Sequence, residues 1–221
     1  ILRRPRPDAD AQVYAGLSGV RGLLNGSRTQ AQFAGPVGVA VDNRPQGGVY
    51  VADTLNNCIR RIDFTDQVTT FLGSGAQGGM TADATPFQQA VFRNPQGVAV
   101  DAGGNVYIAD TDNHAIYVAD LQNRVVRLLA GSPGTPGNAN GRGRAALFRN
   151  PTAIAVQQQT GAFGSSARPG LLVADTGNRR IRFVGLDGEV STLGRAPAPG
   201  SRFHTLADSP EFDFQDLRSL S

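Results

Sequence analysis

Short apolar runs separated by turn-forming residues fill most of the chain. In runs such as Val39–Val41 and Val49–Ala52, neighbouring residues are all apolar, so both sides of each strand are expected to be buried. Glycine, proline, asparagine and aspartate lie between the runs, as is typical of turns between short strands. The pattern predicts an all-β protein whose sheets are covered on both faces.

The apolar runs belong to an internal repeat. The segment Phe33–Asp42 recurs as Phe92–Asp101 and, more loosely, as Phe148–Val156. Three further blocks follow each copy in the same order. The second block is found at Val49–Asn56, Val106–Asn113 and Leu171–Asn178, the third begins at Ile59, Ile116 and Ile181, and the fourth covers Val68–Leu72, Val125–Leu129 and Val190–Leu193.

Four antiparallel strands per repeat predict the blades of a β-propeller, in which radial repetition leaves only short sheet edges. The first strand of each repeat is rich in glycine and alanine, which lets innermost strands crowd around an axis. Each of these strands begins with a proline, where a missing N–H group costs no ladder bond. These prolines are Pro36, Pro95 and Pro151.

The repeated blocks resemble a known family. Gly-Val-Ala-Val-Asp, then Val-Tyr-Val/Ile-Ala-Asp-Thr, then Asn-x-x-Ile is similar to the NHL repeat, and the second copy preserves the Asn113-His114 pair that contributes to the name. The resemblance covers residues 33–194 in three copies. It implies an NHL-type propeller with four-stranded blades, usually six in number, of which about three and a half are expected in this chain. Such a ring would be incomplete.

The repeat divides the chain into expected segments. Residues 1–11 form an N-terminal extension, and residues 12–32 form the outer strand of a preceding blade with its linker. Three NHL repeats are expected at 33–91, 92–147 and 148–194, followed by a C-terminal segment or degenerate repeat start at 195–221. Because six blades exceed this length, we expect the rest of the ring in a longer parent chain. The alternative is a second three-bladed copy.

Composition narrows the possible chemistry. The chain is 40% hydrophobic and 18% charged, with one cysteine and no apolar run long enough for a membrane helix. It lacks an initiator methionine and a signal-peptide core, so something is expected to precede it. A lone cysteine fits a reducing compartment without demonstrating one, and localisation stays unknown. All 21 basic residues are arginine, which reflects either codon bias or selection for planar contacts to carboxylate and phosphate.

Repeated polar residues at the end of the second block are interpreted as structural. Aspartate there can accept hydrogen bonds from N–H groups of the following turn, and asparagine tolerates the left-handed conformation. A cation site used once would not recur in every repeat. The structural residues are expected to be Asp53, Asn56, Asp110, Asn113, Asp175 and Asn178.

Neither histidine supports a metal or catalytic site, because His114 and His204 lie far apart without a neighbouring cluster of ligands. Peptide-amidating lyase domains rely on several histidines, and lactonase-like propellers on central Glu, Asn and Asp. This chain has only Glu189 and Glu211. No nucleophile elbow or phosphate loop is present. We expect no catalytic residue, metal or cofactor.

The links between repeats are the preferred binding region, because long loops without strands are commonly functional. They are expected on one face with the turns between second and third strands. The candidate residues on this face are Arg93, Arg142, Arg144, Arg149, Arg179 and Arg180. The opposite face carries an insertion, 157–169, that is either a contact or a loose loop. The acidic C-terminal residues 208–221 are interpreted as a strand, tail or docking segment.

The sequence thus predicts a non-catalytic scaffold for protein–protein interaction within a larger protein or complex. An RNA-binding propeller that uses the arginine-rich face is the first alternative, since phosphate contacts supply sequence-independent affinity. A metal-assisted hydrolase or lyase is the second.

Overall fold

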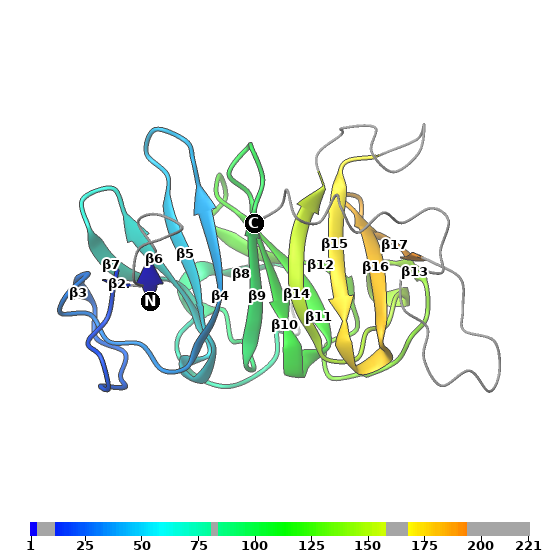
Figure 1. Ribbon diagram of the computed structural model, residues 1–221. Coiled ribbons are helices and arrows are strands. Elements are labelled where there is room, and N and C mark those ends of the chain that lie inside the picture. Colours follow the sequence, from blue (N-terminus) through cyan, green and yellow to red (C-terminus); the bar gives the residue numbers. More distant parts are fainter. Residues whose placement is uncertain (4–11, 81–83, 158–167, 194–221) are drawn as a thin grey trace.

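Three antiparallel sheets of five strands each stand side by side (Figure 1). The computed structural model describes residues 1–3, 12–80, 84–157 and 168–193. Within these residues the helical elements are short 3-10 turns, and no helix is long and apolar enough to cross a membrane. Each sheet is one blade, so the predicted all-β, incomplete propeller is confirmed.

Each blade contains the four predicted strands, in order from the innermost outward. Blade 1 has β4 (Pro36–Asp42), β5 (Gly48–Asp53), β6 (Cys58–Asp63) and β7 (Gln67–Leu72). Blade 2 has β9 (Pro95–Val100), β10 (Val106–Asp110), β11 (Ala115–Asp120) and β12 (Val125–Gly131). Blade 3 has β14 (Pro151–Gln157), β15 (Gly170–Asp175), β16 (Arg180–Gly185) and β17 (Glu189–Leu193).

A short fifth strand lies outside each blade, within a segment that the sequence identifies only as a link. The link before a blade runs up that blade's outer edge and pairs antiparallel with its outermost long strand. These strands are β3 (Gly26–Ser27), β8 (Ala84–Pro86) and β13 (Gly141–Arg142). Two or three residues are too few for an alternating pattern, so sequence periodicity does not reveal them.

The N-terminal segment packs against blade 1. The sequence predicts an outer strand of a preceding blade near Val13; in the structure β2 (Gln12–Val13) pairs antiparallel with β1 (Leu2–Arg3). Ala15 joins the apolar cluster that includes Phe33 of blade 1. Innermost strand β4 stays uncovered on this side, with its exposed valines at 49–60% of full exposure.

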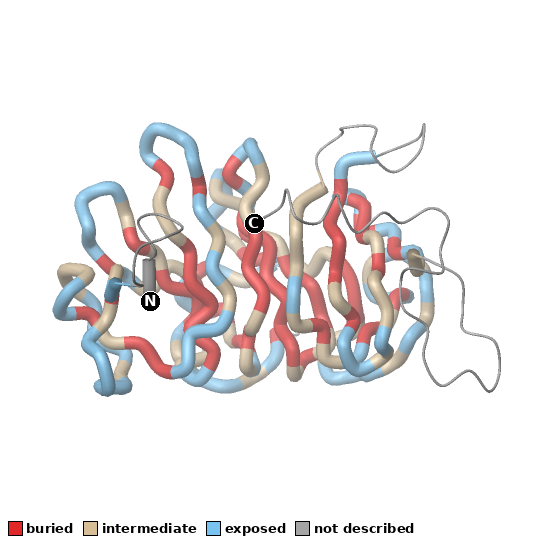
Figure 2. The backbone as a smooth tube through the Cα atoms, in the orientation of Figure 1, coloured by how far each residue is buried: buried red, intermediate tan, exposed pale blue. Residues whose placement is uncertain are grey.

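The core consists of the apolar layers between adjacent blades rather than one central cluster (Figure 2). Tyr50, Ala52, Ile59 and Leu72 of blade 1 face blade 2, and their counterparts Tyr107, Ala109, Ile116 and Ala130 face blade 3. Blade 2 lies between blades 1 and 3 and buries both faces against them, so its strand β10 is apolar and buried at successive positions, as the sequence predicts.

Two features expected from the sequence lie beyond the described residues. They are ten residues of the 157–169 insertion, 158–167, and the whole C-terminal segment from residue 194.

Candidate functional site

The links and the turns between second and third strands meet at one end of the blades, the lower end in Figure 1. Each turn is a 3-10 helix whose last residue donates a side-chain N–H to a carbonyl of the preceding link. Asn56 Nδ2 donates to Gly22 O at 2.7 Å, and Asn113 Nδ2 to Gly78 O and Asn178 Nδ2 to Gly137 O at 2.6 Å. We call this end the link face. It comprises η1 (Thr54–Asn56), η3 (Thr111–Asn113), η5 (Thr176–Asn178) and the link residues beside them.

The repeated aspartates lie fully buried at the base of these turns. Asp53 Oδ1 accepts the backbone N–H of Ala34 at 2.7 Å, while its Oδ2 accepts Asn56 Nδ2 at 2.8 Å. Asp110 and Asp175 make the same pair of contacts in their blades. The backbone donors belong to the approach to the innermost strand, whereas the sequence pattern predicts them in the turn itself. Each carboxylate therefore joins two segments that are distant along the chain.

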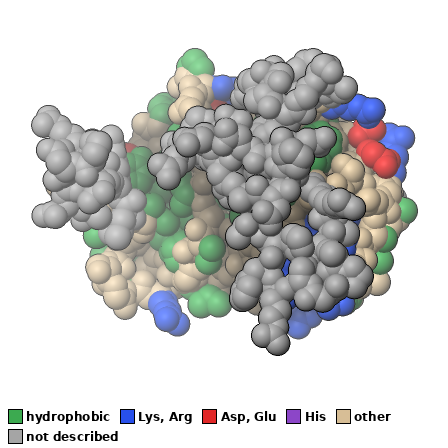
Figure 3. Space-filling view, turned by 45° about the vertical axis from the view of Figure 1, so that its right-hand side comes forward, with side chains coloured by type: hydrophobic (Ala, Val, Ile, Leu, Met, Phe, Trp, Pro, Cys, Tyr) green, Lys and Arg blue, Asp and Glu red, His purple; other side chains and the backbone are tan. Residues whose placement is uncertain are grey.

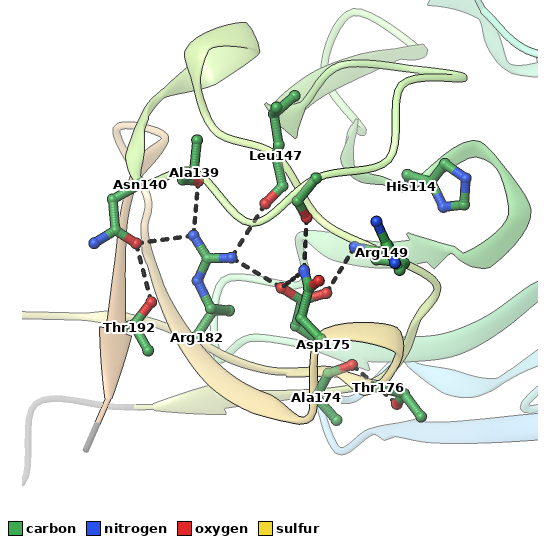
Figure 4. Close-up of polar contacts among 12 residues, drawn as sticks. His114, Ala139, Asn140, Leu147, Arg149, Ala174, Asp175, Thr176, Arg182 and Thr192 are labelled. Carbon is green, nitrogen blue, oxygen red and sulfur yellow. Dashed lines mark hydrogen bonds and ion pairs between the residues drawn. The ribbon is translucent and has the colours of Figure 1, made fainter. Parts of the chain in front are cut away.

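Two buried arginines complete this network, and sequence reasoning missed both. The Arg182 guanidinium donates to Asp175 Oδ2 at 2.8 Å, Leu147 O at 3.1 Å and Ala139 O at 2.8 Å (Figure 4). It lies over the ring of Phe148 at 5.2 Å. Arg60 occupies the equivalent place in blade 1, and both side chains are fully buried. An arginine seven residues after the repeated aspartate, inside an apolar strand, was the available signal.

Blade 2 departs from this arrangement because Tyr117 stands where the arginine would be. Its ring meets Phe92 edge-on at 6.0 Å, and its hydroxyl is buried without a hydrogen-bond partner among the described residues. Asp110 therefore keeps two hydrogen bonds but receives no guanidinium. Burial raises the pKa of Asp110 to about 8.

We expect Asp110 to make stability pH-dependent. Its pKa is raised above the unfolded value, so its favourable contribution is present below about pH 4 and is lost as pH rises towards 8. Over that range, the free energy of unfolding of the wild type should fall, relative to Asp110→Asn, by more than about 1.4 kcal/mol, the equivalent of one pKa unit. Urea denaturation at a series of pH values measures this. Parallel curves for the two proteins would contradict it.

Contacts across the link face lock neighbouring blades together. Thr54 Oγ1 donates to Pro95 O, and Thr111 Oγ1 to Pro151 O, both at 2.8 Å. The residue after η1 and the residue after η3 take a left-handed conformation, and the side chain of each accepts an N–H group from the next blade. Asn57 Oδ1 accepts from Asn94 N at 3.0 Å.

His114 is the corresponding acceptor in blade 2, where its Nδ1 accepts from Asn150 N at 3.1 Å. The pKa of His114 is lowered, and desolvation is the largest cause. Asp112 and a hydrogen bond with the Thr111 backbone raise this pKa, whereas the charges of Arg149 and Arg93 lower it. The neutral imidazole ring thus accepts a hydrogen bond that joins blades 2 and 3, so we assign His114 a structural role.

Acidification is expected to weaken the junction between blades 2 and 3. Because the pKa of His114 is depressed, its contribution is present above pH 6.5 and is lost as pH falls through the folded value. The change is about 1 kcal/mol, the net value of a hydrogen bond. In His114→Asn, which copies Asn57 of blade 1, this loss should disappear. Thermal denaturation between pH 7 and pH 5 tests it; an equal loss in the variant would contradict the assignment.

The structure separates the six candidate arginines. Arg93 and Arg149 directly precede Asn94 and Asn150 on the link face, and their side chains are exposed. Arg179 follows η5 on the same face, and Arg180 begins β16.

Arg142 and Arg144 were expected on the link face but lie near the outer edge of blade 3. Arg142 Nε donates to Asp187 O at 3.0 Å, in the turn at the opposite end of the blade, and the adjacent Gly143 N bonds Gly188 O. They lie there because the link climbs the blade to form β13.

Within the part of the chain that is described, the guanidinium groups of Arg93, Arg149 and Arg179 have no partner. Arg149 lies beside His114 in Figure 4. In the view of Figure 3, the arginine side chains that can be seen lie at several separate places on the surface. The link face therefore offers a few free cationic groups on tightly held backbone.

Neither a metal centre nor a reactive thiol is built from the described residues. No group of three or more His, Cys, Asp or Glu side chains there could hold a metal ion. Burial raises the pKa of the Cys58 thiol to about 12, so it stays protonated.

The sheets and their junctions define an open β-propeller with repeated blades. The NHL repeat model matches residues 33–62 and 92–119, which span the three inner strands of blades 1 and 2 except for the last residue of β6 and of β11. The chain thus contains two segments that match the NHL repeat.

Several known proteins are similar to parts of this chain in sequence or in fold. NHL repeat-containing protein 2 from Homo sapiens is 34% identical over 110 residues, covering 49% of this chain and 15% of the relative. The chain thus spans a small part of that protein's length. An auxiliary nutrient binding protein from Bacteroides ovatus has a similar fold, with TM-score 0.52, 18% identity, and 73% and 36% coverage of the two chains. Virginiamycin B lyase from Staphylococcus aureus matches with TM-score 0.47 and 13% identity, over 85% of this chain and 46% of that one.

Proposed function

We propose that this chain is a non-catalytic propeller segment that binds a protein partner on its link face. One observation carries the proposal. Arg93 and Arg149 expose guanidinium groups that have no partner among the described residues, while their backbone N–H groups are held by the buried carboxyl groups of Asp110 and Asp175 at 2.8 Å and 2.7 Å.

The fixed backbone beneath the Arg93 and Arg149 side chains favours binding of a partner. A side chain on fixed backbone loses less conformational freedom on binding than one on a loose loop. Arginine is enriched at interface hot spots, and its planar donor array matches carboxylates in a bidentate manner. A partner with acidic residues facing the link face fits these groups.

The absence of catalysis is part of the proposal. The groups able to transfer protons at the link face are engaged in holding the fold: Asp53 and Asp175 by arginine and asparagine, Asp110 by asparagine, and His114 by the next blade. A general acid or base needs access to a substrate proton, which a fully buried carboxylate lacks.

The test is affinity capture from the source organism, followed by titration of each purified partner against two variants. Arg93→Ala/Arg149→Ala is expected to weaken the dissociation constant at least about tenfold, the effect of removing a hot spot. The control, Arg127→Ala/Arg142→Ala, removes the same charge from exposed side chains off the link face, at 51% and 68% exposure. Equal affinities for both variants would refute the proposed surface.

RNA binding is the second candidate, favoured by the same free guanidinium groups. If it holds, a single-stranded uridine 20-mer binds the wild type at low salt, and affinity falls steeply with added salt and in Arg93→Ala/Arg149→Ala. Few aromatic residues accompany these arginines, so stacking platforms for bases are scarce. We therefore expect no binding of this probe.

A further inference from the structure

Polar side chains from blades 2 and 3 gather where the two blades meet on the link face. Asp112 lies at the centre: its Oδ2 accepts a hydrogen bond from Asn94 Nδ2, and its Oδ1 accepts one from Asn150 Nδ2 at 3.1 Å. Asn94 and Asn150 directly follow Arg93 and Arg149 in the chain. One carboxylate therefore holds together the two backbone segments that carry the free guanidinium groups.

The side chain of Arg149 lies across the turn η5. A Cβ on Gly177 of this turn would stand 2.5 Å from Arg149 Cγ and 3.0 Å from its Cδ, so the missing side chain leaves room for the arginine. Arg149 lies beside His114 in Figure 4, and the positive charges of Arg149 and Arg93 both act on the imidazole ring. The two arginines thus flank this histidine.

His114 presents an N–H group at the same place. Its Nδ1 accepts from Asn150 N at 3.1 Å, so the neutral ring carries its hydrogen on Nε2. Among the described residues Nε2 has no hydrogen-bond partner, and it is in contact with solvent. The hydrogen bond between the blades therefore fixes the ring in a position where it offers a third donor beside the two arginines.

We propose that Arg93, His114 and Arg149 bind the phosphate group of a phosphorylated serine or threonine on the protein partner. We call these three residues the anion site. The inference rests on the proposed function, because it names the chemical group that the link face recognises.

The number of donors favours phosphate over carboxylate. Each guanidinium offers a fork of parallel N–H groups, and the ring offers one more N–H. A phosphate monoester has three terminal oxygens, so each of the three side chains can bind one of them. A carboxylate has only two oxygens, and a phosphodiester of an RNA backbone has only two that are not part of the chain.

Charge favours the same ligand. A phosphorylated side chain carries about −1.5 to −2 charges at pH 7, which two guanidinium groups can balance. The Asp112 carboxylate is directed to the amides of Asn94 and Asn150, but its charge still weakens the attraction for an anion. Both arginines are therefore needed for binding.

Phosphoserine, acetylated at its amino group and amidated at its carboxyl group, tests the anion site without a partner. Binding to the 221-residue chain at pH 7 is followed by NMR through the imidazole signal of His114, which is identified by its absence in His114→Asn. We expect a saturable shift, and inorganic phosphate should produce one as well. Glutamate capped in the same way, and dimethyl phosphate as the diester, should bind at least about tenfold more weakly.

Two variants separate a built site from diffuse positive charge. Arg93→Ala/Arg149→Ala should weaken the binding of capped phosphoserine at least about tenfold. Arg93→Lys/Arg149→Lys keeps the charge but removes both forks, and should weaken it at least about fivefold. The control Arg127→Ala/Arg142→Ala, which removes the same charge off the link face, should bind like the wild type.

An absent shift with capped phosphoserine would overturn the proposal, as would equal affinity for capped glutamate or unchanged affinity in the alanine variant. Binding of inorganic phosphate without binding of capped phosphoserine would also overturn it, because the site would then hold a free ion. Titration of the purified partner against the link-face variants does not depend on these results. Failure of phosphate recognition can therefore be distinguished from failure of the proposed function.

Discussion

Replacing Arg182 by alanine is expected to lower the free energy of unfolding by about 3–5 kcal/mol, because breaking a buried ion pair leaves an uncompensated charge. Asp175 stays fully buried in the variant, with its hydrogen bonds from Arg149 N and Asn178 but without the guanidinium. The carbonyls of Leu147 and Ala139 also lose their donor. Urea denaturation followed by circular dichroism measures the loss.

The matched control is Arg127→Ala. Arg127 pairs with Asp120 at 3.0 Å, but its side chain is half exposed, so water replaces the partner and the cost should stay below about 1 kcal/mol. Arg182→Tyr should recover part of the loss, because blade 2 packs Tyr117 against Phe92 at the same position. If Arg182→Ala costs no more than the control, the network does not stabilise the blade.

Replacing Gly38 by alanine is expected to destabilise the junction between blades 1 and 2 by about 3 kcal/mol, towards the upper end of overpacking effects. The added Cβ would collide with Gln96 O and lie 3.2 Å from Val98 N. Backbone atoms of a paired strand cannot rotate away as a flexible side chain can, so the two blades must separate.

Ala153→Gly is the converse control at the equivalent position of blade 3. There the alanine methyl is exposed, and its removal should cost only about 0.5–1 kcal/mol through lost chain stiffness. Thermal denaturation of both variants beside the wild type distinguishes the effects. Similar costs at the two positions would show that close approach of the strands does not explain Gly38.

Much of the fold could be predicted because burial on both faces leaves a local trace. Runs such as Val49–Ala52 are apolar at every position, and their recurrence with turn residues between them predicts blades. The candidate site was harder to predict from the sequence. Arg60 and Arg182 are fully buried, although a charged residue in a strand is most simply interpreted as facing solvent. Only the neighbouring link supplies the carbonyls that make their burial tolerable.

The separation of the candidate arginines between the link face and the outer edge of blade 3 was also missed, because it too depends on the path of the link. Arg142 was expected with Arg149 because both belong to one link, yet the link climbs the blade and returns, so Arg142 bonds Asp187 O at the other end. Its two-residue strand gains its pairing from β17, not from its own sequence. Proximity along the chain was therefore a poor guide to proximity on the surface.

By itself, the sequence determined the all-β class, the three repeats, their strands and the NHL resemblance, since each depends on residues close together in the chain. The tertiary structure alone decided which backbone N–H each aspartate binds and that His114 is a junction acceptor. Hydrogen bonds between blades join residues far apart in the chain, 36 positions in the case of His114 and Asn150, and their geometry is set by sheet packing rather than by local pattern.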